Sequence, residues 1–215
     1  CLVGSEMCIR DRPYIQAREV NSLGTCSNPI DWKTGRTVEL LSQGESALWH
    51  ILRWDDDVVD IREQYPLDLK QTFKISGKLG IQHPGKNPMT TDLLATMRDG
   101  RLIAYSLKPS KAVLNNKRTV EKLFLEKMYW TKQNVEFRLI FKSDINMTLY
   151  HNIRLVVEFY DAKFVHDDAS VLKHLIATKQ VSVNMESAIL SIRKLKPIYE
   201  KEIAIWRRNS MSVTF

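Results

Sequence analysis

The feature that most constrains the fold is a strand–turn–strand pattern in the middle of the sequence. Two stretches rich in apolar residues, 90–97 and 101–108, flank the pair Asp99-Gly100. Aspartate followed by glycine between such stretches is a strong β-hairpin signal, because glycine readily adopts the backbone angles that tight turns require. The sequence therefore predicts two adjacent antiparallel strands here.

Each predicted strand carries one charge that is unusual for its position, Asp92 in the first and Lys108 in the second. A buried ion without a partner is costly, so such charges need an explanation. A two-residue loop would set Asp92 opposite Leu107, on the wrong face for a contact with Lys108. A three-residue loop or a bulge would set it opposite Lys108. The functional interpretation therefore requires an odd loop or a bulge.

An aspartate and a lysine at one sheet edge suit phosphoryl chemistry. Carboxylates hold a hard cation such as Mg²⁺, and a lysine can orient water or neutralise developing charge. Glu45 is the best second carboxylate, because Ser42-Gln43-Gly44-Glu45 fits a capping box that opens a helix. Structural alternatives stay open: Glu45 as a cap only, Asp92 as a loop cap, and Lys108 as a strand-end lysine reaching water.

The order of elements predicts an α/β fold. After an irregular arm over 13–41, we expect a helix from 42 to about 54, a strand over 58–67, a loop over 68–90 and the hairpin. A helix over 118–134 and a strand over 135–144 follow. This order, helix, three strands, helix, strand, predicts a mixed sheet flanked by helices. Two or three amphipathic helices over 163–215 indicate a small C-terminal helical subdomain, and a truncated one is left open.

Residues 1–12, CLVGSEMCIRDR, resemble a translated sequencing adapter, and we exclude them from fold reasoning as not native. Cys26 is then the one remaining cysteine, so no disulfide framework is expected and a reducing cytosol fits. The formal net charge of +7 is compatible with a polyanionic partner, nucleic acid first. No apolar run approaches the length of a membrane span.

Several segments together resemble the TnsA endonuclease family, over about residues 30–155. They are KTGRTVELLSQGE, DDDVVDIREQYPL, IQHPGKNPMTTDLLA, YSLKPSKAV, RTVEKLFLEKMYW and VEFRLIFKSDINMTLYHNI, in that order. TnsA is the subunit of heteromeric cut-and-paste bacterial transposons that cuts the 5′ strands at the transposon ends. The resemblance implies a restriction-endonuclease-like core of the PD-(D/E)xK type, in a nuclease domain over 13–162, followed by the helical subdomain over 163–215.

The resemblance also implies the site. Glu45 and Asp92 would be catalytic carboxylates and metal ligands, the Leu107 backbone carbonyl a further ligand, and Lys108 the catalytic lysine. The expected cofactor is Mg²⁺, with Mn²⁺ as a substitute. The position two before the lysine is acidic in the wider superfamily and is Ser106 here. A neutral hydroxyl is a weaker ligand, so Ser106 is an auxiliary candidate only.

The expected partners are double-stranded DNA at transposon ends, a TnsB-type transposase, and a TnsC-type ATPase contacted through the C-terminal region. No membrane partner is expected, and a bacterial cytoplasmic location follows. Candidate phosphate contacts are the basic residues Arg36, Lys111, Lys117 and Arg118. Two alternatives remain: a stand-alone restriction or repair nuclease of the same fold, and a catalytically dead scaffold, for which Ser106 is the reason.

Overall fold

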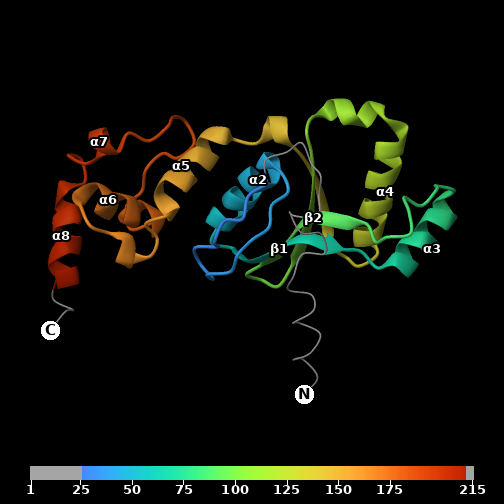
Figure 1. Ribbon diagram of the computed structural model, residues 1–215, viewed down its shortest axis with the longest axis horizontal. Coiled ribbons are helices and arrows are strands. Elements are labelled where there is room, and N and C mark those ends of the chain that lie inside the picture. The colour runs from blue at the N-terminus through green and yellow to red at the C-terminus, as the bar shows by residue number, and fades with distance from the viewer. Residues whose placement is uncertain (1–25, 212–215) are drawn as a thin grey trace, which may run out of the picture. The chain divides into compact units, whose positions relative to one another are not determined.

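The computed structural model describes residues 26–211, and the segment interpreted as an adapter lies outside this range. The elements are shown in Figure 1. They are α2 (Gln43–Trp54), β1 (Val58–Pro66), α3 (Leu69–Leu79), β2 (Thr90–Met97), β3 (Leu102–Lys108), η2 (Lys111–Asn115), α4 (Lys117–Thr131), β4 (Glu136–Phe141), η3 (Lys142–Asp144), α5 (Met147–Val157), η4 (Ala162–Phe164), α6 (Asp168–Ala177), α7 (Ile192–Leu195) and α8 (Glu200–Met211).

The described residues divide into two compact units. The first comprises 26–29 and 37–145, and the second comprises 30–36 and 146–211. The second unit is helical, as expected, but it begins with α5, which packs against α6, so it starts earlier in the chain than residue 163. Asn152 on α5 fixes the loop after α6, since its side chain donates to the carbonyls of Met185 and Ala188.

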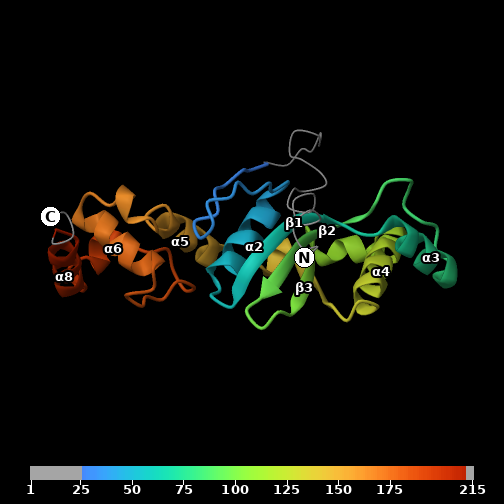
Figure 2. The same cartoon turned by 90° about the horizontal axis from the view of Figure 1, so that it is seen from below.

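The first unit is built on a four-stranded mixed sheet of order β1-β2-β3-β4. The pairs β1–β2 and β2–β3 are antiparallel, whereas β3 and β4 are parallel and are connected through α4. This confirms the predicted α/β class and the mixed sheet flanked by helices. Figure 2 shows the strands from below, with α3 and α4 side by side.

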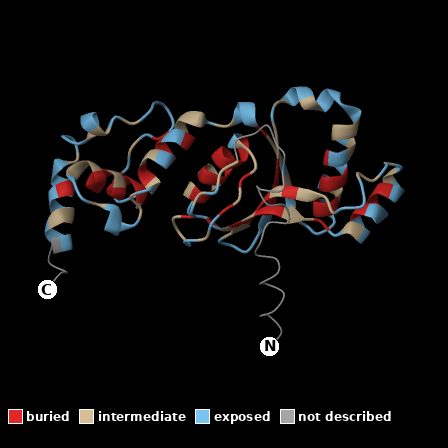
Figure 3. Ribbon diagram, in the orientation of Figure 1, coloured by how far each residue is buried: buried red, intermediate tan, exposed pale blue. Residues whose placement is uncertain are grey.

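Helices α3 and α4 share one hydrophobic core with the sheet. Leu67, Ile75, Leu94, Ala104, Leu125, Tyr129 and Trp130 form it, and each is almost fully buried. Figure 3 shows buried residues along the strands and on the inner sides of α2 and α4. Burial of these apolar side chains is the main stabilising term for this unit. It fixes α4 against the centre of the sheet.

Two helices were not predicted. The stretch 68–90 was expected to be a loop, but α3 occupies its first half. Asp68 caps that helix by accepting from the Gln71 amide, and Gly80 ends it with a φ of 64°. The glycine was therefore a helix stop signal rather than a loop signal. The second is α5, whose residues resemble a strand in composition because β-branched and aromatic types recur in it.

The hairpin has the parity that the functional interpretation required. Leu94 pairs with Ala104 and Thr96 with Leu102, and the Met97 amide donates to the Arg101 carbonyl. The loop is therefore Arg98–Gly100, a three-residue connection in which Gly100 has a φ of 84°. Continued along the strands, this register sets Asp92 opposite Ser106 rather than opposite Lys108. The predicted partner was wrong by two positions, and the predicted odd loop is confirmed.

Candidate active site

Glu45 lies in the first turn of α2 and is held by three hydrogen bonds. Its Oε1 accepts from the Ser42 hydroxyl at 3.0 Å, and its Oε2 accepts from the Leu41 amide at 3.0 Å and from Gln64 Nε2 at 3.3 Å. Ser42 in turn accepts from the Glu45 amide, so it is the N-cap that the sequence predicts. Ser42 caps α2 as predicted, but the Glu45 carboxylate accepts from the Leu41 amide instead of closing a capping box on the Ser42 amide. Its hydrogen bonds hold the carboxylate in one position.

Asp92 and Lys108 meet, as the sequence analysis expected. Lys108 Nζ lies 3.6 Å from Asp92 Oδ2, and both side chains are partly buried. The same carboxylate oxygen accepts from the Leu107 amide at 2.6 Å, which ties β2 to β3 just before the end of β3. Lys108 Nζ also donates to the Leu107 carbonyl at 2.8 Å and to Ser106 Oγ at 3.1 Å. Direct contacts therefore link the four site residues on β2 and β3, which are Asp92, Ser106, Leu107 and Lys108.

Glu45 joins this network electrostatically. Burial raises the pKa of Glu45 above its usual value, and the charge of Asp92 raises it further, while the hydrogen bonds from Leu41, Ser42 and Gln64 act in the opposite direction. A buried carboxylate whose ionisation is disfavoured by a neighbouring negative charge marks a place where a cation is favourable. The structure therefore brings Glu45, Asp92 and Lys108 together from α2, β2 and β3.

The sequence analysis missed Gln64, which supports Glu45 from β1. Gln64 is buried and has a φ of 46°, a left-handed conformation that is rare for a residue with a side chain. Its amide nitrogen donates to Glu45, and its carbonyl oxygen accepts from the Thr90 hydroxyl at 3.0 Å. Glu63 and Gln64 are both buried, which breaks the alternation of the strand. Strained backbone of this kind is characteristic of functional sites.

The second residue missed is Glu126, on the side of α4 that faces the sheet. Its carboxylate accepts from the Thr91 hydroxyl at 2.8 Å, and Thr91 in turn accepts from Trp130 Nε1 at 2.7 Å. Burial raises the pKa of Glu126 to about 7, and the charge of Asp92 adds to this, whereas contacts with Thr91, Lys108 and Ser106 lower it. A third carboxyl, that of Glu126, therefore lies buried close to Ser106 and Asp92. Its signal was helical spacing, since Glu126 falls in the buried stripe with Leu123 and Trp130.

The donor atoms of the site fit a hard divalent cation. Within residues 26–211, no three His, Cys, Asp or Glu side chains gather as in a self-contained metal cluster. The expected ligands do not require one, because they are the carboxylates of Glu45 and Asp92 and the carbonyl of Leu107. All are oxygen atoms, the type that Mg²⁺ prefers. The buried Glu45 carboxylate supports the fit, because burial and the nearby charge of Asp92 raise its pKa and a bound cation would offset both effects.

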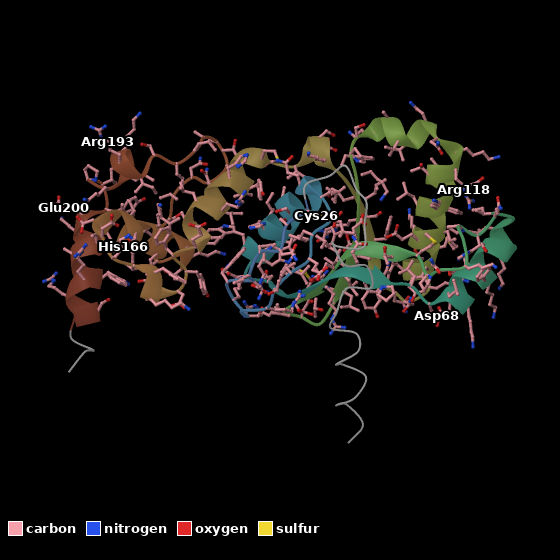
Figure 4. All side chains as sticks on the ribbon, in the orientation of Figure 1. Cys26, Asp68, Arg118, His166, Arg193 and Glu200 are labelled. Carbon is pink, nitrogen blue, oxygen red and sulfur yellow. The ribbon has the colours of Figure 1, made fainter. Side chains whose placement is uncertain are left out.

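Two of the four basic residues considered for phosphate contacts, Lys111 and Arg118, form ion pairs with acidic side chains. Arg36 belongs to the second unit. Lys111 pairs with Asp144, and Arg118 pairs with Glu121 and donates to the Gln82 carbonyl. Lys117 is the exposed first residue of α4. Arg118, labelled in Figure 4, thus ties α4 to the loop after α3. None of these contacts tests a role in DNA binding.

In the part of the chain that the structure describes, no helix has the length and apolar character needed to cross a membrane.

Comparison with known proteins agrees with this geometry. Residues 55–142 match the family model described as "TnsA-like endonuclease N terminal". The chain is also 35% identical, over 169 residues, to the Transposon Tn7 transposition protein TnsA of Escherichia coli. That alignment covers 76% of this chain and 60% of the relative, so the chain spans somewhat more than half of the relative's length. Residues 55–142, which include all four strands of the sheet and the residues Asp92 and Lys108, are thus identified as a TnsA-like endonuclease N-terminal domain.

Proposed function

We propose that the chain is the DNA endonuclease subunit of a TnsA/TnsB-type transposase, hydrolysing phosphodiesters in the 5′ strands at transposon ends. The observation that carries this proposal is the contact of Lys108 with Asp92 at 3.6 Å, with the buried carboxylate of Glu45 near enough for the charge of Asp92 to raise its pKa. The family and the similarity to a transposition protein support it. The proposal includes Mg²⁺ as the natural cofactor, with Mn²⁺ able to replace it.

The residues would share the work as follows. Glu45, Asp92 and the Leu107 carbonyl would hold Mg²⁺, which when bound acidifies water and stabilises charge on a phosphoryl oxygen. Lys108 places a positive charge beside these ligands, where it stabilises the negative charge that develops on the phosphate. Its contacts with Ser106 Oγ and the Leu107 carbonyl fix the ammonium group, so its position does not depend on the substrate.

A second candidate function is a scaffold that binds DNA and a transposition partner without cutting, because Ser106 stands where the wider superfamily has an acidic residue. Ser106 is 1% exposed and accepts from Lys108 Nζ, so it orients the lysine rather than presenting a ligand to solvent. Glu126 is close enough to Ser106 for the Ser106 hydroxyl to lower its pKa, and we propose that its carboxyl takes the place of the acid that the wider superfamily has at the position of Ser106. This arrangement favours the nuclease over the scaffold.

The first experiment is Mn²⁺ binding, followed by paramagnetic water relaxation. The wild-type chain is compared with Glu45→Ala and Asp92→Ala, and with Asp60→Ala as a control for a surface carboxylate that pairs with Arg62. We expect binding at millimolar concentrations or tighter, lost in the two site variants and kept in the control. Mn²⁺ binding that is unchanged in Glu45→Ala and Asp92→Ala would favour the scaffold function.

The second experiment separates a transposase subunit from a stand-alone nuclease. The substrate is DNA that carries transposon ends, incubated with the partner transposase, with this chain, or with both. We propose that cutting of the 5′ strands requires both proteins and that the TnsC-type ATPase contacts the second unit. Cutting of DNA without transposon ends by this chain alone would indicate a restriction or repair nuclease.

A further inference from the structure

A groove next to Lys108 is not explained by the metal ligands. Its volume is about 630 Å³, and it is bounded by the loop 84–90 on one side and by α4 on the other. Lys108 and Glu126, which belong to the candidate site, also line it. The groove is therefore continuous with the place where a phosphodiester would be cut.

The loop that forms one wall is fixed, although it has no regular secondary structure. His83 is stacked on Phe73, with ring centroids 3.9 Å apart, and its Nε2 lies 3.0 Å from Thr72 Oγ1 on α3. His83 Nδ1 lies 2.7 Å from the Gly85 carbonyl, and Arg118 of α4 donates to the Gln82 carbonyl. Contacts with α3 and α4 thus hold this wall in place before any ligand binds.

The charges in the groove favour an anionic ligand. Lys86 from the loop and Lys122 from α4 are exposed, and no hydrogen bond or ion pair engages either of them among the described residues. Lys108 adds a third cation, and Glu126 is the one acidic side chain in the lining. Thr119, Lys122 and Glu126 follow one side of the helix at intervals of three and four residues.

The size of the groove suits a strand of nucleic acid. From Thr119 to Glu126 the helix rises about 10 Å, at about 1.5 Å per residue. One DNA strand advances about 3.4 Å per nucleotide along the helix axis, so this wall is as long as about three nucleotide steps. The groove therefore has space for a short stretch of backbone beside the reacting phosphate.

We propose that this groove binds the sugar–phosphate backbone of the cut strand next to the scissile phosphodiester, with Lys86 and Lys122 each contacting a phosphate. The inference rests on the proposed nuclease function and assigns the side on which the strand runs. Such contacts position the DNA and do not read its sequence. Lys86 and Lys122 therefore act on strand placement, and Lys108 acts on the reaction.

The test is the salt dependence of binding to a fluorescein-labelled 20-base-pair duplex, measured by anisotropy with Ca²⁺ present and Mg²⁺ omitted. The variants are Lys86→Ala, Lys122→Ala and their combination. Lys132→Ala is the matched control, because it removes the same charge just beyond the other end of α4. We expect each groove variant to lower the slope of log K against log salt by about 1, and the double variant by about 2. The control is expected to keep the wild-type slope.

Four results would overturn the inference. The first is a double variant with the wild-type slope, and the second is an equal loss in Lys132→Ala. The third is a wild-type chain that binds no duplex at 20 mM KCl, and the fourth is one that binds a polyglutamate peptide with the same dependence on Lys86 and Lys122. The metal site is tested without DNA, so a chain that binds Mn²⁺ through Asp92 but fails here loses only the groove. A chain with the expected slopes but no such Mn²⁺ site keeps the groove and loses the nuclease function.

Discussion

At the scale of single residues, a substitution of Lys108 should affect DNA cutting and metal binding in different ways. Its ammonium group lies 3.6 Å from Asp92 Oδ2, so it competes with a metal ion for that carboxylate. We expect Lys108→Ala to lower DNA cutting at least about 100-fold, because one stabilising charge is removed from the transition state. We expect the same variant to bind Mn²⁺ as tightly as the wild type or more tightly. Loss of Mn²⁺ binding would instead give the lysine a structural role.

Two variants of Gln64 distinguish the effect of its side chain on the position of Glu45 from the effect of its backbone strain on stability. Gln64→Ala and Gln64→Gly both remove the hydrogen bond to Glu45, so both should weaken Mn²⁺ binding by the same factor. Only glycine adopts the φ of 46° without strain. The alanine variant should therefore have an unfolding free energy about 1 kcal/mol lower than that of the glycine variant, measured by urea denaturation.

Two outcomes would contradict this account of Gln64. If the alanine and glycine variants bind Mn²⁺ as the wild type does, the side chain does not position Glu45. If the alanine and glycine variants have the same unfolding free energy, the positive φ at position 64 does not destabilise the fold. Thr90→Val is a useful companion, because it removes the other hydrogen bond of Gln64 and leaves the contact with Glu45.

The residues that were predicted correctly and those that were missed differ in a physical way. Asp92 and Lys108 interrupt a period-two apolar pattern, so the sequence marks them as unusual. Glu126 lies in a helix rich in charged residues, where one more glutamate attracts no notice. Its burial depends on Thr91 and Ser106, which approach only after the sheet and α4 have packed. Helical spacing places Glu126 on the buried side of α4, but only tertiary contacts distinguish it from the other glutamates of that helix.

At the scale of elements, the approach of α2 to β3 fixes where Glu45 lies. Gly44 precedes Glu45, and a Cβ atom added to it would lie 2.8 Å from Leu107 Cδ2. Real Cβ atoms do not approach another atom so closely, so Gly44→Ala must displace the Leu107 side chain, whose carbonyl is an expected metal ligand. The glycine is therefore explained by a close approach of two elements.

A double-mutant cycle tests that approach. In the wild-type background, the clash should offset the gain of roughly 0.5–1 kcal/mol that alanine has over glycine within a helix. In the Leu107→Ala background the obstacle is absent, so Gly44→Ala should raise the unfolding free energy by that amount. Urea denaturation of the four proteins measures the coupling. An equal effect of Gly44→Ala in both backgrounds would show that α2 has room to move away.

The elements also show how far a single sequence leads. The helix from 42 and the four strands were predicted because their period and their caps are local properties. The odd hairpin loop was required by the function assigned to Asp92, and the structure has it. The helix α3 was not predicted because Gly77 and Gly80 favour a loop in the sequence, although Gly77 lies in the last turn of the helix and Gly80 ends it. In α5, strand-like residue types hide a helix that packing against α6 stabilises.

At the scale of the whole molecule, one buried carboxyl should make stability depend on pH. The pKa of Glu126 is about 7 in the folded protein and 4.5 in an exposed reference state. A raised acid pKa means that the folded state binds the proton more tightly than the unfolded state. The free energy of unfolding should therefore fall as the pH rises from about 4.5 to about 7, by up to about 3 kcal/mol.

The variant Glu126→Gln removes this titration while keeping an acceptor for the Thr91 hydroxyl. We expect it to be more stable than the wild type at pH 8, to approach the wild type at pH 5, and to lose most of the difference between these two conditions. Urea denaturation in EDTA, followed by tryptophan fluorescence, measures this without metal binding. Glu121→Gln is the control, because it changes a glutamate of the same helix that pairs with Arg118. A pH dependence that is the same in all three proteins would mean that Glu126 is ionised alike in the folded and unfolded states. Its place in the network would then rest on hydrogen bonds alone.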